Sequence, residues 1–392
     1  MFSFVVKKRK VNDDYLYTVI KIGYNSVSLG VFSVVNEKPV MLYQAQKFLS
    51  GFFSENIQRF NLLLSLLDNI LATTPSQYAN KRVFVSYDPC WVFSTVRTFF
   101  AESRISNEFS LRDIESNILK SAQDDMDNFF STPNLKRDFF VLEKKIANIH
   151  VDELPFEVAQ DTVAAKTIHI SYFICAVDNS LHTLLTKKIY RYFSQKNCIF
   201  TTYALPMYVV SNEILSMQNV SNSNFNLINI SEGSTSSMFN THNMLVHYGY
   251  SNKGLNLFLD NVSDEKIYLS EMKLIASQKI KVHSNYSVHA KLHLRSQVWF
   301  DELIRQVNFL KHNFGSTDTY VLCASLDTQD WFRFIVNNHD KGGLFQNTLN
   351  SRVIIIDRNT IGGLVLSKIE NPITELLCLG WYYKLLTLHI NK

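Results

Sequence analysis

Two short segments in opposite halves of the chain share one layout, and this repetition constrains the fold more than any other feature. The first is IKIGYNSVSL at 20–29, and the second is INISEGSTS at 228–236. In each, apolar β-branched residues run into a turn of Gly, Asn and Ser, which is typical of a β-hairpin. Strand-like stretches recur at 15–22, 27–35 and 39–46, and again at 227–230, 236–239 and 244–248. The repeat is weak in identity but clear in layout, so it predicts two lobes that each open with a meander.

The block between the two hairpins has a pattern of its own. Ser110 precedes Asp113 by three residues, which is typical of a helix N-cap. The helix that follows is expected to place five apolar residues on one face: Leu111, Ile114, Ile118, Ala122 and Met126. With strands at 82–87, 139–149 and 167–177, the block predicts a small inserted domain of strand, helix, strand and strand.

The remaining elements complete the two lobes, since 392 residues are too many for one compact core. Helices are expected at 55–72, 181–193, 297–313, 331–338 and 373–386, with strands at 320–324 and 353–356. Residues 198–210 read as a strand region interrupted by Pro206, and 216–226 as a linker rich in Ser and Asn. The predicted ranges are 1–81 and 180–215 for the first lobe, 82–179 for the inserted domain, 225–352 for the second lobe, and 353–392 for a closing segment that returns to the first lobe.

Composition excludes several classes of protein. The five cysteines are isolated and odd in number, which is typical of reduced thiols in the cytoplasm. The chain contains no apolar run of about 18 residues that would predict a membrane span. The net charge of +4 is spread along the chain apart from a basic run at 7–10, which reads as a solvated edge. A cytoplasmic protein with no nucleic-acid partner is therefore expected.

The turn residues are chemically suited to phosphate, because Gly and small hydroxyl residues let backbone N–H groups approach an anion closely. Gly23, Asn25 and Ser26 in the first turn and Gly233, Ser234 and Thr235 in the second are therefore candidates to line a nucleotide cleft. No catalytic group or metal-ligand set follows from spacing. His289 and His293 fall in a strand-like region, too far apart there to share one zinc ion.

The half-repeats, the inserted block and the two turns together resemble the bacterial actin-like family that includes the cell-division protein FtsA and the type IV pilus assembly protein PilM. Residues 21–29 are similar to the first phosphate motif of the family, and 229–236 to its second. Residues 83–86, the helix at 111–129 and the strands at 139–149 and 167–177 resemble its inserted domain. The resemblance implies an α/β, actin-like ATPase fold with two lobes, each built on a ribonuclease H-like sheet, and an inserted strand–helix–strand–strand domain.

The same resemblance predicts that the nucleotide chemistry is lost. The phosphate motifs of the family begin with Asp, whereas this chain has Lys21 and Asn229 there, and neither replaces a metal-binding carboxylate. Ala324 and Ser325 bring Cβ atoms to the place where the family has a Gly-rich turn. A non-catalytic protein is therefore expected, and weak ATP binding without turnover stays open because backbone amides can still hold phosphate.

The resemblance also implies partners. PilM-like members bind a short cytoplasmic peptide of an inner-membrane protein, whereas FtsA-like members bind the tubulin-like division ring and anchor it through a C-terminal amphipathic helix. The sequence stops directly after its last expected helix, which favours the pilus-type role at the inner face of the membrane. A division-type role remains an alternative, as does a nucleotide-regulated enzyme of the sugar-kinase or chaperone branch of the superfamily. A homo-oligomer also stays open.

An aromatic cluster just past the strand at 82–87 is the candidate partner site. It comprises Trp91, Phe93, Phe99 and Phe100, which could anchor an apolar peptide in a groove between the first lobe and the inserted domain. The alternative carries equal weight: clustered Phe and Trp residues are usually buried, so these four could form the core of the inserted domain.

Overall fold

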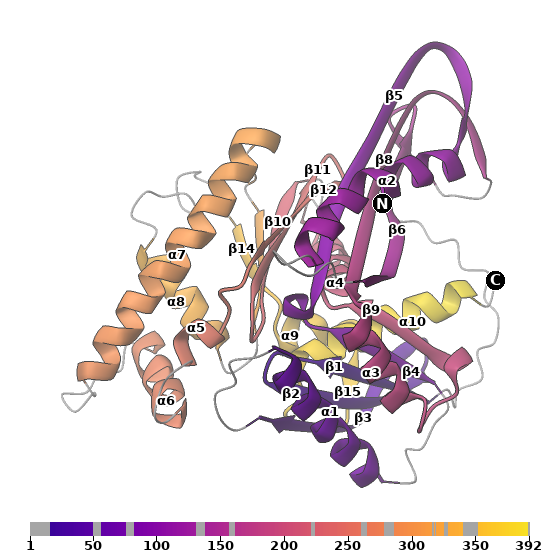
Figure 1. Ribbon diagram of the computed structural model, residues 1–392. Coiled ribbons are helices and arrows are strands. Elements are labelled where there is room, and N and C mark those ends of the chain that lie inside the picture. The colour runs from indigo at the N-terminus through magenta and orange to yellow at the C-terminus, as the bar shows by residue number, and fades with distance from the viewer. Residues whose placement is uncertain are drawn as a thin grey trace.

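The computed structural model describes residues 16–49, 56–75, 82–130, 138–156, 161–220, 224–259, 265–277, 286–315, 317, 319–324, 328–339 and 352–390. The described strands form three sheets, one in each of two lobes and one that projects from between them (Figure 1). Among the described helices, none combines the length and the apolar character needed to cross a membrane.

The first sheet begins with an antiparallel meander and continues with parallel strands. Its order is β15-β3-β2-β1-β4-β9. The strands are β1 (Tyr17–Ile22), β2 (Ser26–Val35), β3 (Lys38–Phe48), β4 (Val83–Tyr87), β9 (Cys198–Thr202) and β15 (Leu366–Ser367). Helices α1 (Asn56–Thr73) and α3 (Asn179–Ile189) lie on one side of this sheet, and α10 (Thr374–Ile390) lies on the other (Figure 1). Because both faces are covered, every residue of β1 is buried.

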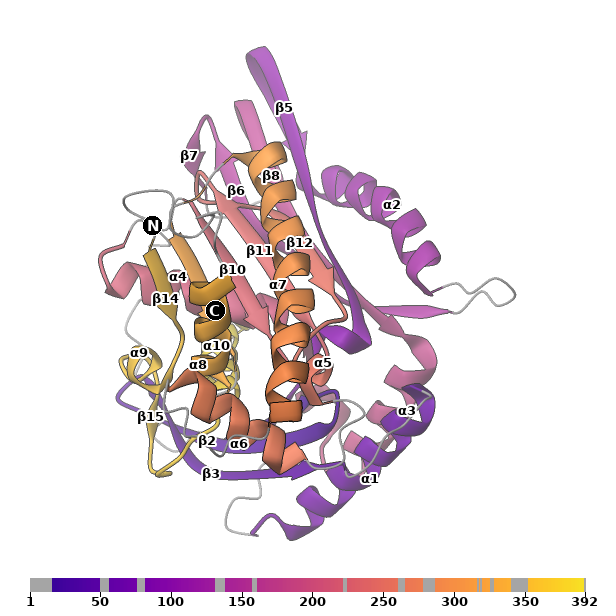
Figure 2. The same cartoon turned by 90° about the vertical axis from the view of Figure 1, so that its left-hand side faces the viewer.

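The second sheet repeats this arrangement. Its order is β12-β11-β10-β13-β14, again an antiparallel meander followed by parallel strands. The strands are β10 (Phe225–Ile230), β11 (Thr235–Thr241), β12 (Met244–Ser251), β13 (Thr319–Cys323) and β14 (Arg352–Ile355). Helices α5 (Asn256–Leu259), α6 (Glu265–Ala276), α7 (Tyr286–Phe314) and α8 (Gln329–His339) gather on its outer side (Figure 2). The expected repetition of two lobes is thus present in the strand order itself.

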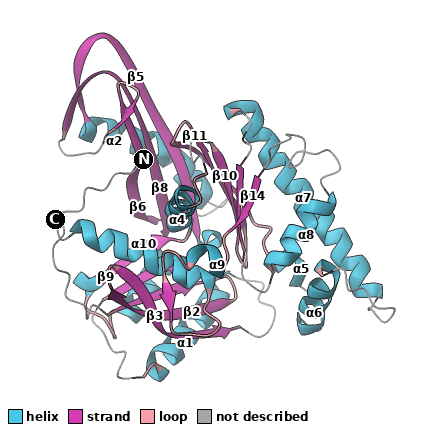
Figure 3. Ribbon diagram, turned by 180° about the vertical axis from the view of Figure 1, so that it is seen from behind, coloured by secondary structure: helices cyan, strands magenta, loops and turns pink. Residues whose placement is uncertain are grey.

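Two helices connect the lobes. α4 (Ala204–Met217) contacts both α10 of the first lobe and β10 of the second, and it lies between the two sheets when the molecule is seen from behind (Figure 3). The short helix α9 (Arg358–Ile361) follows β14, and a capping box of Asp357 and Thr360 caps its N-terminus. One large apolar core therefore includes residues from α4, α10 and strands of both sheets.

The inserted sheet is antiparallel, with the order β5-β8-β6-β7. Its elements are β5 (Val92–Ser110), α2 (Leu111–Phe130), β6 (Phe139–Val151), β7 (Leu154–Pro155) and β8 (Thr162–Asp178). The Asp113 N–H donates to Ser110 Oγ at 3.2 Å, so the predicted N-cap is confirmed. The expected apolar face of α2 is buried against this sheet, in the residues Leu111, Ile114, Ile118, Ala122 and Met126.

One buried amide joins the inserted sheet to the second lobe. Asn148 of β6 lies on the face opposite α2, and its Oδ1 accepts a hydrogen bond of 2.8 Å from the Leu245 N–H of β12. The Ser171 hydroxyl donates to the same oxygen at 3.3 Å. The hydroxyl of Tyr208 on α4 donates to Asn240 Oδ1 of β11 at 2.7 Å. The projecting sheet is thereby hydrogen-bonded to the meander of the second lobe.

Three predicted elements differ in the structure. β4 pairs with β1 and β9, so the strand at 83–87 lies in the first sheet and not with the inserted block. Residues 204–210 are helical, because Pro206 falls in the first turn of α4, where a missing N–H costs nothing. α7 begins at Tyr286, well before the predicted start at 297, so His289 and His293 lie on a helix. Val288 and Leu292 extend its buried stripe in that direction.

The contact between α10 and β2 offers a test of the first lobe. A Cβ at Gly380 would lie 2.6 Å from the ring of Phe32, and the Gly380 carbonyl accepts a hydrogen bond from Tyr17. We expect Gly380→Ala to lower the free energy of unfolding by about 1–3 kcal/mol because the core is overpacked. Chemical denaturation measures this, with Ser116→Ala on the exposed side of α2 as the control. Equal stability of the two variants would contradict the packing described.

Candidate functional site

The candidate site lies where the hairpin turns of the two lobes meet. The β1–β2 turn comprises Gly23, Tyr24 and Asn25, and the β10–β11 turn comprises residues 231–234. The carboxyl end of β4 reaches the same point through Asp88. In open sheets with parallel strands, binding sites form at the carboxyl ends of the strands. The turns predicted from the sequence to hold phosphate therefore face each other across the junction.

Lys21 lies at the centre of the junction, 4% exposed. Its Nζ is 4.0 Å from Asp88 Oδ2 and 3.6 Å from Glu375 Oε1, and it lies over the ring of Tyr203 at 4.7 Å. Burial by itself lowers the pKa of Lys21, but the carboxylates of Glu375 and Asp88 outweigh it and hold that pKa above its usual value. A buried positive charge therefore lies at the end of β1, at the centre of the junction.

Asp88 is a site residue that the sequence reasoning missed. It is fully buried, and its Oδ1 accepts hydrogen bonds from Ser231 Oγ at 2.9 Å and from the Cys90 N–H at 3.2 Å. The second of these caps the short 3-10 turn Pro89–Trp91. The Ser231 bond crosses from the first lobe to the second. A carboxylate directly after the buried strand at 82–87 was the sequence signal that could have identified it.

Glu232 is the other missed residue, and it reaches across the junction into the first hairpin. Its Oε2 accepts a hydrogen bond of 2.8 Å from the Asn25 N–H, and its Oε1 accepts one from the Ser26 hydroxyl. Burial raises the pKa of Glu232, while Lys21 and these two donors act in the opposite direction. The Glu232 carboxylate of the second hairpin thus accepts hydrogen bonds from two donors of the first hairpin.

Aromatic side chains and glycines close the space around this contact. A Cβ at Gly23 would lie 2.8 Å from Glu232 Oε2, and one at Gly233 would lie 2.8 Å from the Tyr24 ring. The indole Nε1 of Trp91 donates to the Gly23 carbonyl at 2.7 Å. Both turns therefore need glycine because the opposite hairpin packs directly against them.

The predicted cleft residues fall into two groups. Lys21, Gly23, Asn25, Ser26, Gly233 and Ser234 meet at the junction, with Ser234 Oγ 2.9 Å from Ser231 Oγ. Asn229 is buried within β10, and its amide atoms have no hydrogen-bond partner among the described residues.

The other two described candidates make structural contacts. Thr235 Oγ1 accepts from Trp299 Nε1 at 2.9 Å and donates to the Lys253 carbonyl at 2.7 Å. Ala324 is buried, and its carbonyl accepts from Gln329 Nε2. Ser325 lies outside the described residues, and the role of this set in binding a nucleotide stays a prediction.

The four aromatic candidates for partner binding do not form one cluster. Trp91 packs with Tyr24 and Phe60 in the first lobe. Phe93 and Phe99 are half-buried on the α2 side of the inserted sheet. Phe100 points to the opposite face and is 62% exposed. Neighbours on a strand face opposite sides of a sheet, so Phe99 and Phe100 cannot share one surface.

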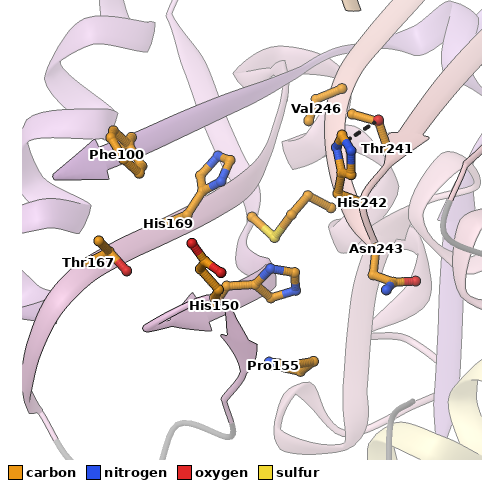
Figure 4. Close-up of a pocket in the computed structure, with 11 residues that line it drawn as sticks. Phe100, His150, Pro155, Thr167, His169, Thr241, His242, Asn243 and Val246 are labelled. Atoms are coloured by element: carbon orange, nitrogen blue, oxygen red, sulfur yellow. Dashed lines mark hydrogen bonds between the residues drawn. The ribbon is translucent and has the colours of Figure 1, made fainter. Parts of the chain in front are cut away.

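Phe100 instead lines a groove of about 550 Å³ between the inserted sheet and the tip of the β11–β12 hairpin (Figure 4). His150 and His169 lie next to each other on paired strands, and His242 faces them from the hairpin. Burial lowers the pKa of both His150 and His169, and each imidazole is therefore neutral at pH 7. Over the described ranges, no group of three His, Cys, Asp or Glu side chains is arranged to hold a metal ion.

The ion cluster around Lys21 yields a direct test. We expect Lys21→Met to lower the free energy of unfolding by about 3 kcal/mol, because Asp88 and Glu375 would keep their burial without a cation. The double variant Lys21→Met/Asp88→Asn should be more stable than the sum of the two single changes predicts. Denaturant unfolding measures the cycle, with Lys120→Met on the exposed side of α2 as the control. Strict additivity would show that Lys21 and Asp88 do not interact.

Known proteins resemble this chain in fold but not in sequence. No family model matches the sequence, and no curated protein matches it. The structure is similar to a chain of the "PilM-PilN type IV pilus biogenesis complex", with a TM-score of 0.61 and 11% identity over 95% of this chain and 98% of that one.

Two further likenesses are more distant. One is a protein of Bacteroides thetaiotaomicron with an actin-like ATPase fold and unknown function, at a TM-score of 0.45 and 11% identity over 94% of this chain and 96% of that one. The other is the cytoplasmic domain of EpsL, an inner membrane component of the type II secretion system of Vibrio cholerae, at 0.36 and 7% over 95% of each chain. These two scores are too low to support a conclusion. The PilM–PilN likeness and the repeated strand order confirm the predicted fold: the chain has a two-lobed, actin-like α/β fold.

Proposed function

We propose that this protein is a non-catalytic cytoplasmic scaffold of an inner-membrane assembly, with a PilM-like role in the biogenesis of a type IV pilus. The observation that carries the proposal is the likeness, over nearly the whole of both chains, to a chain of the PilM–PilN complex. A protein that keeps a large two-lobed fold without its nucleotide chemistry keeps it for its surfaces. The partner would be a short cytoplasmic segment of an inner-membrane protein.

The closed junction supports a non-catalytic role. Lys21 is paired with Asp88 and Glu375, and the donors of the first hairpin are taken by Glu232. A Mg²⁺–nucleotide complex requires oxygen ligands for the cation and free donors for the phosphates. The charges and donors of the junction are instead paired with one another, which supports a site without turnover.

The division into parts is proposed in the same terms. The first lobe would comprise 1–81 and 180–215, the second lobe 225–352, and the closing segment 353–392. The inserted domain was predicted over 82–179, but β4 pairs within the first sheet, so we place the start of the insertion after Asp88. Each proposed part then contains one complete sheet or a segment that completes one.

The docking surface follows from the position of Phe100. Of the four aromatic candidates, Phe100 has the most exposed side chain, and it opens onto the groove beside His169. Trp91 is held in the first lobe by its hydrogen bond to Gly23, and Phe93 and Phe99 pack toward α2. We therefore propose Phe100 as the anchor for the partner peptide, with Phe93 and Phe99 supporting the strand that presents it.

Hydrolysis of ATP separates a scaffold from an enzyme. We expect the purified protein to hydrolyse ATP no faster than Lys21→Ala, because the carboxylates described at the junction, Asp88, Glu375 and Glu232, are paired within the chain. Release of inorganic phosphate measures this. Asp88→Asn is the second control, since Asp88 is a buried carboxylate of the junction. Steady turnover that either substitution abolishes would establish an enzyme of the sugar-kinase type and refute the scaffold role.

Recruitment of the partner tests Phe100. We expect Phe100→Ser to weaken binding of the inner-membrane partner by about tenfold or more, as is common for an exposed aromatic anchor. Affinity capture from the native cell followed by mass spectrometry identifies the partner, and titration of its cytoplasmic peptide gives the Kd. Leu294→Ser is the matched control, because Leu294 is 66% exposed on α7 of the second lobe.

The identity of the captured protein decides between the related roles. A pilus-assembly protein whose binding depends on Phe100 supports the proposal. Capture of the tubulin-like division protein would show an FtsA-like role. Equal binding by the wild type and Phe100→Ser would place the docking surface elsewhere.

A further inference from the structure

We propose that Glu232 is an internal ligand that latches the two lobes together, so that closure of the protein needs no nucleotide. The latch is the carboxylate of Glu232 with its two donors, the Asn25 N–H at 2.8 Å and the Ser26 hydroxyl. Each carboxylate oxygen accepts one hydrogen bond from the first hairpin. The donors belong to the first lobe and the acceptor to the second, so the contact spans the junction.

The residues around the Glu232 carboxylate leave just enough room for it. Gly23 has no Cβ, and one built there would lie 2.8 Å from Glu232 Oε2. Gly233 follows the glutamate and packs against the ring of Tyr24. The guanidinium of Arg59 also lies over that ring, 3.8 Å from its centroid, which holds Tyr24 in position. Both hairpins are therefore shaped around the side chain that crosses between them.

Three groups of the first lobe favour the charged form of Glu232, whereas its burial and the nearby Asp88 carboxylate raise its pKa. A backbone N–H and a hydroxyl directed at one place form a small anion-binding turn. The buried ammonium of Lys21 adds a positive field from the end of β1. Hydrogen bonds to an ionised acceptor are roughly twice as strong as neutral ones. These contacts therefore offset part of the cost of burying the Glu232 carboxylate, and loss of the contact would leave the hairpin donors without their acceptor.

A second link lies beside the first and acts in parallel. Ser231, the residue before Glu232, donates to Asp88 Oδ1 at 2.9 Å. Consecutive residues of the second hairpin thus bind two different segments of the first lobe. The latch would act in the same way whichever partner the protein binds.

The test uses the full-length protein and Glu232→Ala. Amide hydrogen exchange at Asn25 reports on the latch directly, because that N–H is one of its donors. We expect exchange at Asn25 to become at least about tenfold faster in Glu232→Ala, as for an amide released by local opening. Small-angle X-ray scattering should show a larger radius of gyration. Glu102→Ala, at an exposed position of the inserted sheet, should change neither measurement.

Chemical rescue shows whether Glu232 acts through its carboxylate group or only by filling space between the hairpins. Formate carries the same carboxylate group, so added formate should slow the exchange at Asn25 in Glu232→Ala and leave the wild type unchanged. Unchanged exchange in Glu232→Ala, or faster exchange that formate does not slow, would overturn the proposal. If Glu232→Ala does not fold, Glu232→Leu, which fills a similar space but has no hydrogen-bond acceptor, carries the same test. Faster exchange at Asn25 then supports the latch, and unchanged exchange refutes it.

Discussion

The buried ammonium group of Lys21 is the interaction on which the rest of the junction depends. It lies at the end of β1, the strand that pairs with both β2 and β4. Asp88 after β4 and Glu375 at the start of α10 both face it. Removal of a charge from water is costly unless it is paired. The cluster therefore penalises any packing that leaves one of the three groups alone, and so fixes how β4 and α10 meet β1.

This arrangement reverses the charges of a nucleotide site. A metal–nucleotide site presents carboxylates to a cation and amide donors to phosphates. In this protein the strand end supplies the cation itself, and the opposite hairpin supplies the anion. The buried charges of the junction are thus paired with groups of the chain itself. The two lobes meet there through hydrogen bonds between their own side chains and backbone.

Local sequence patterns were sufficient to predict most helices and strands, whereas the contacts at the junction depend on tertiary packing. The hairpins, the capped helix α2 and the two-lobed layout follow from turn residues and periodicity, which act within a few residues of each other. Glu232 could not be found in that way, because its donors lie in the other half of the chain. The predicted cluster of four aromatic residues is not present, and the reason lies in strand geometry. The two-residue period of a strand separates Phe99 from Phe100, and counting residues in the sequence could have shown it.

Asn148 connects the projecting sheet to the second lobe. One buried oxygen of this residue accepts from Leu245 of β12 and from Ser171 of β8. A pull on the inserted sheet is therefore borne by the meander of the second lobe, and not by the covalent chain at the base of the insertion alone. Displacement of the inserted sheet would therefore break this buried hydrogen bond and leave the Leu245 N–H without its acceptor.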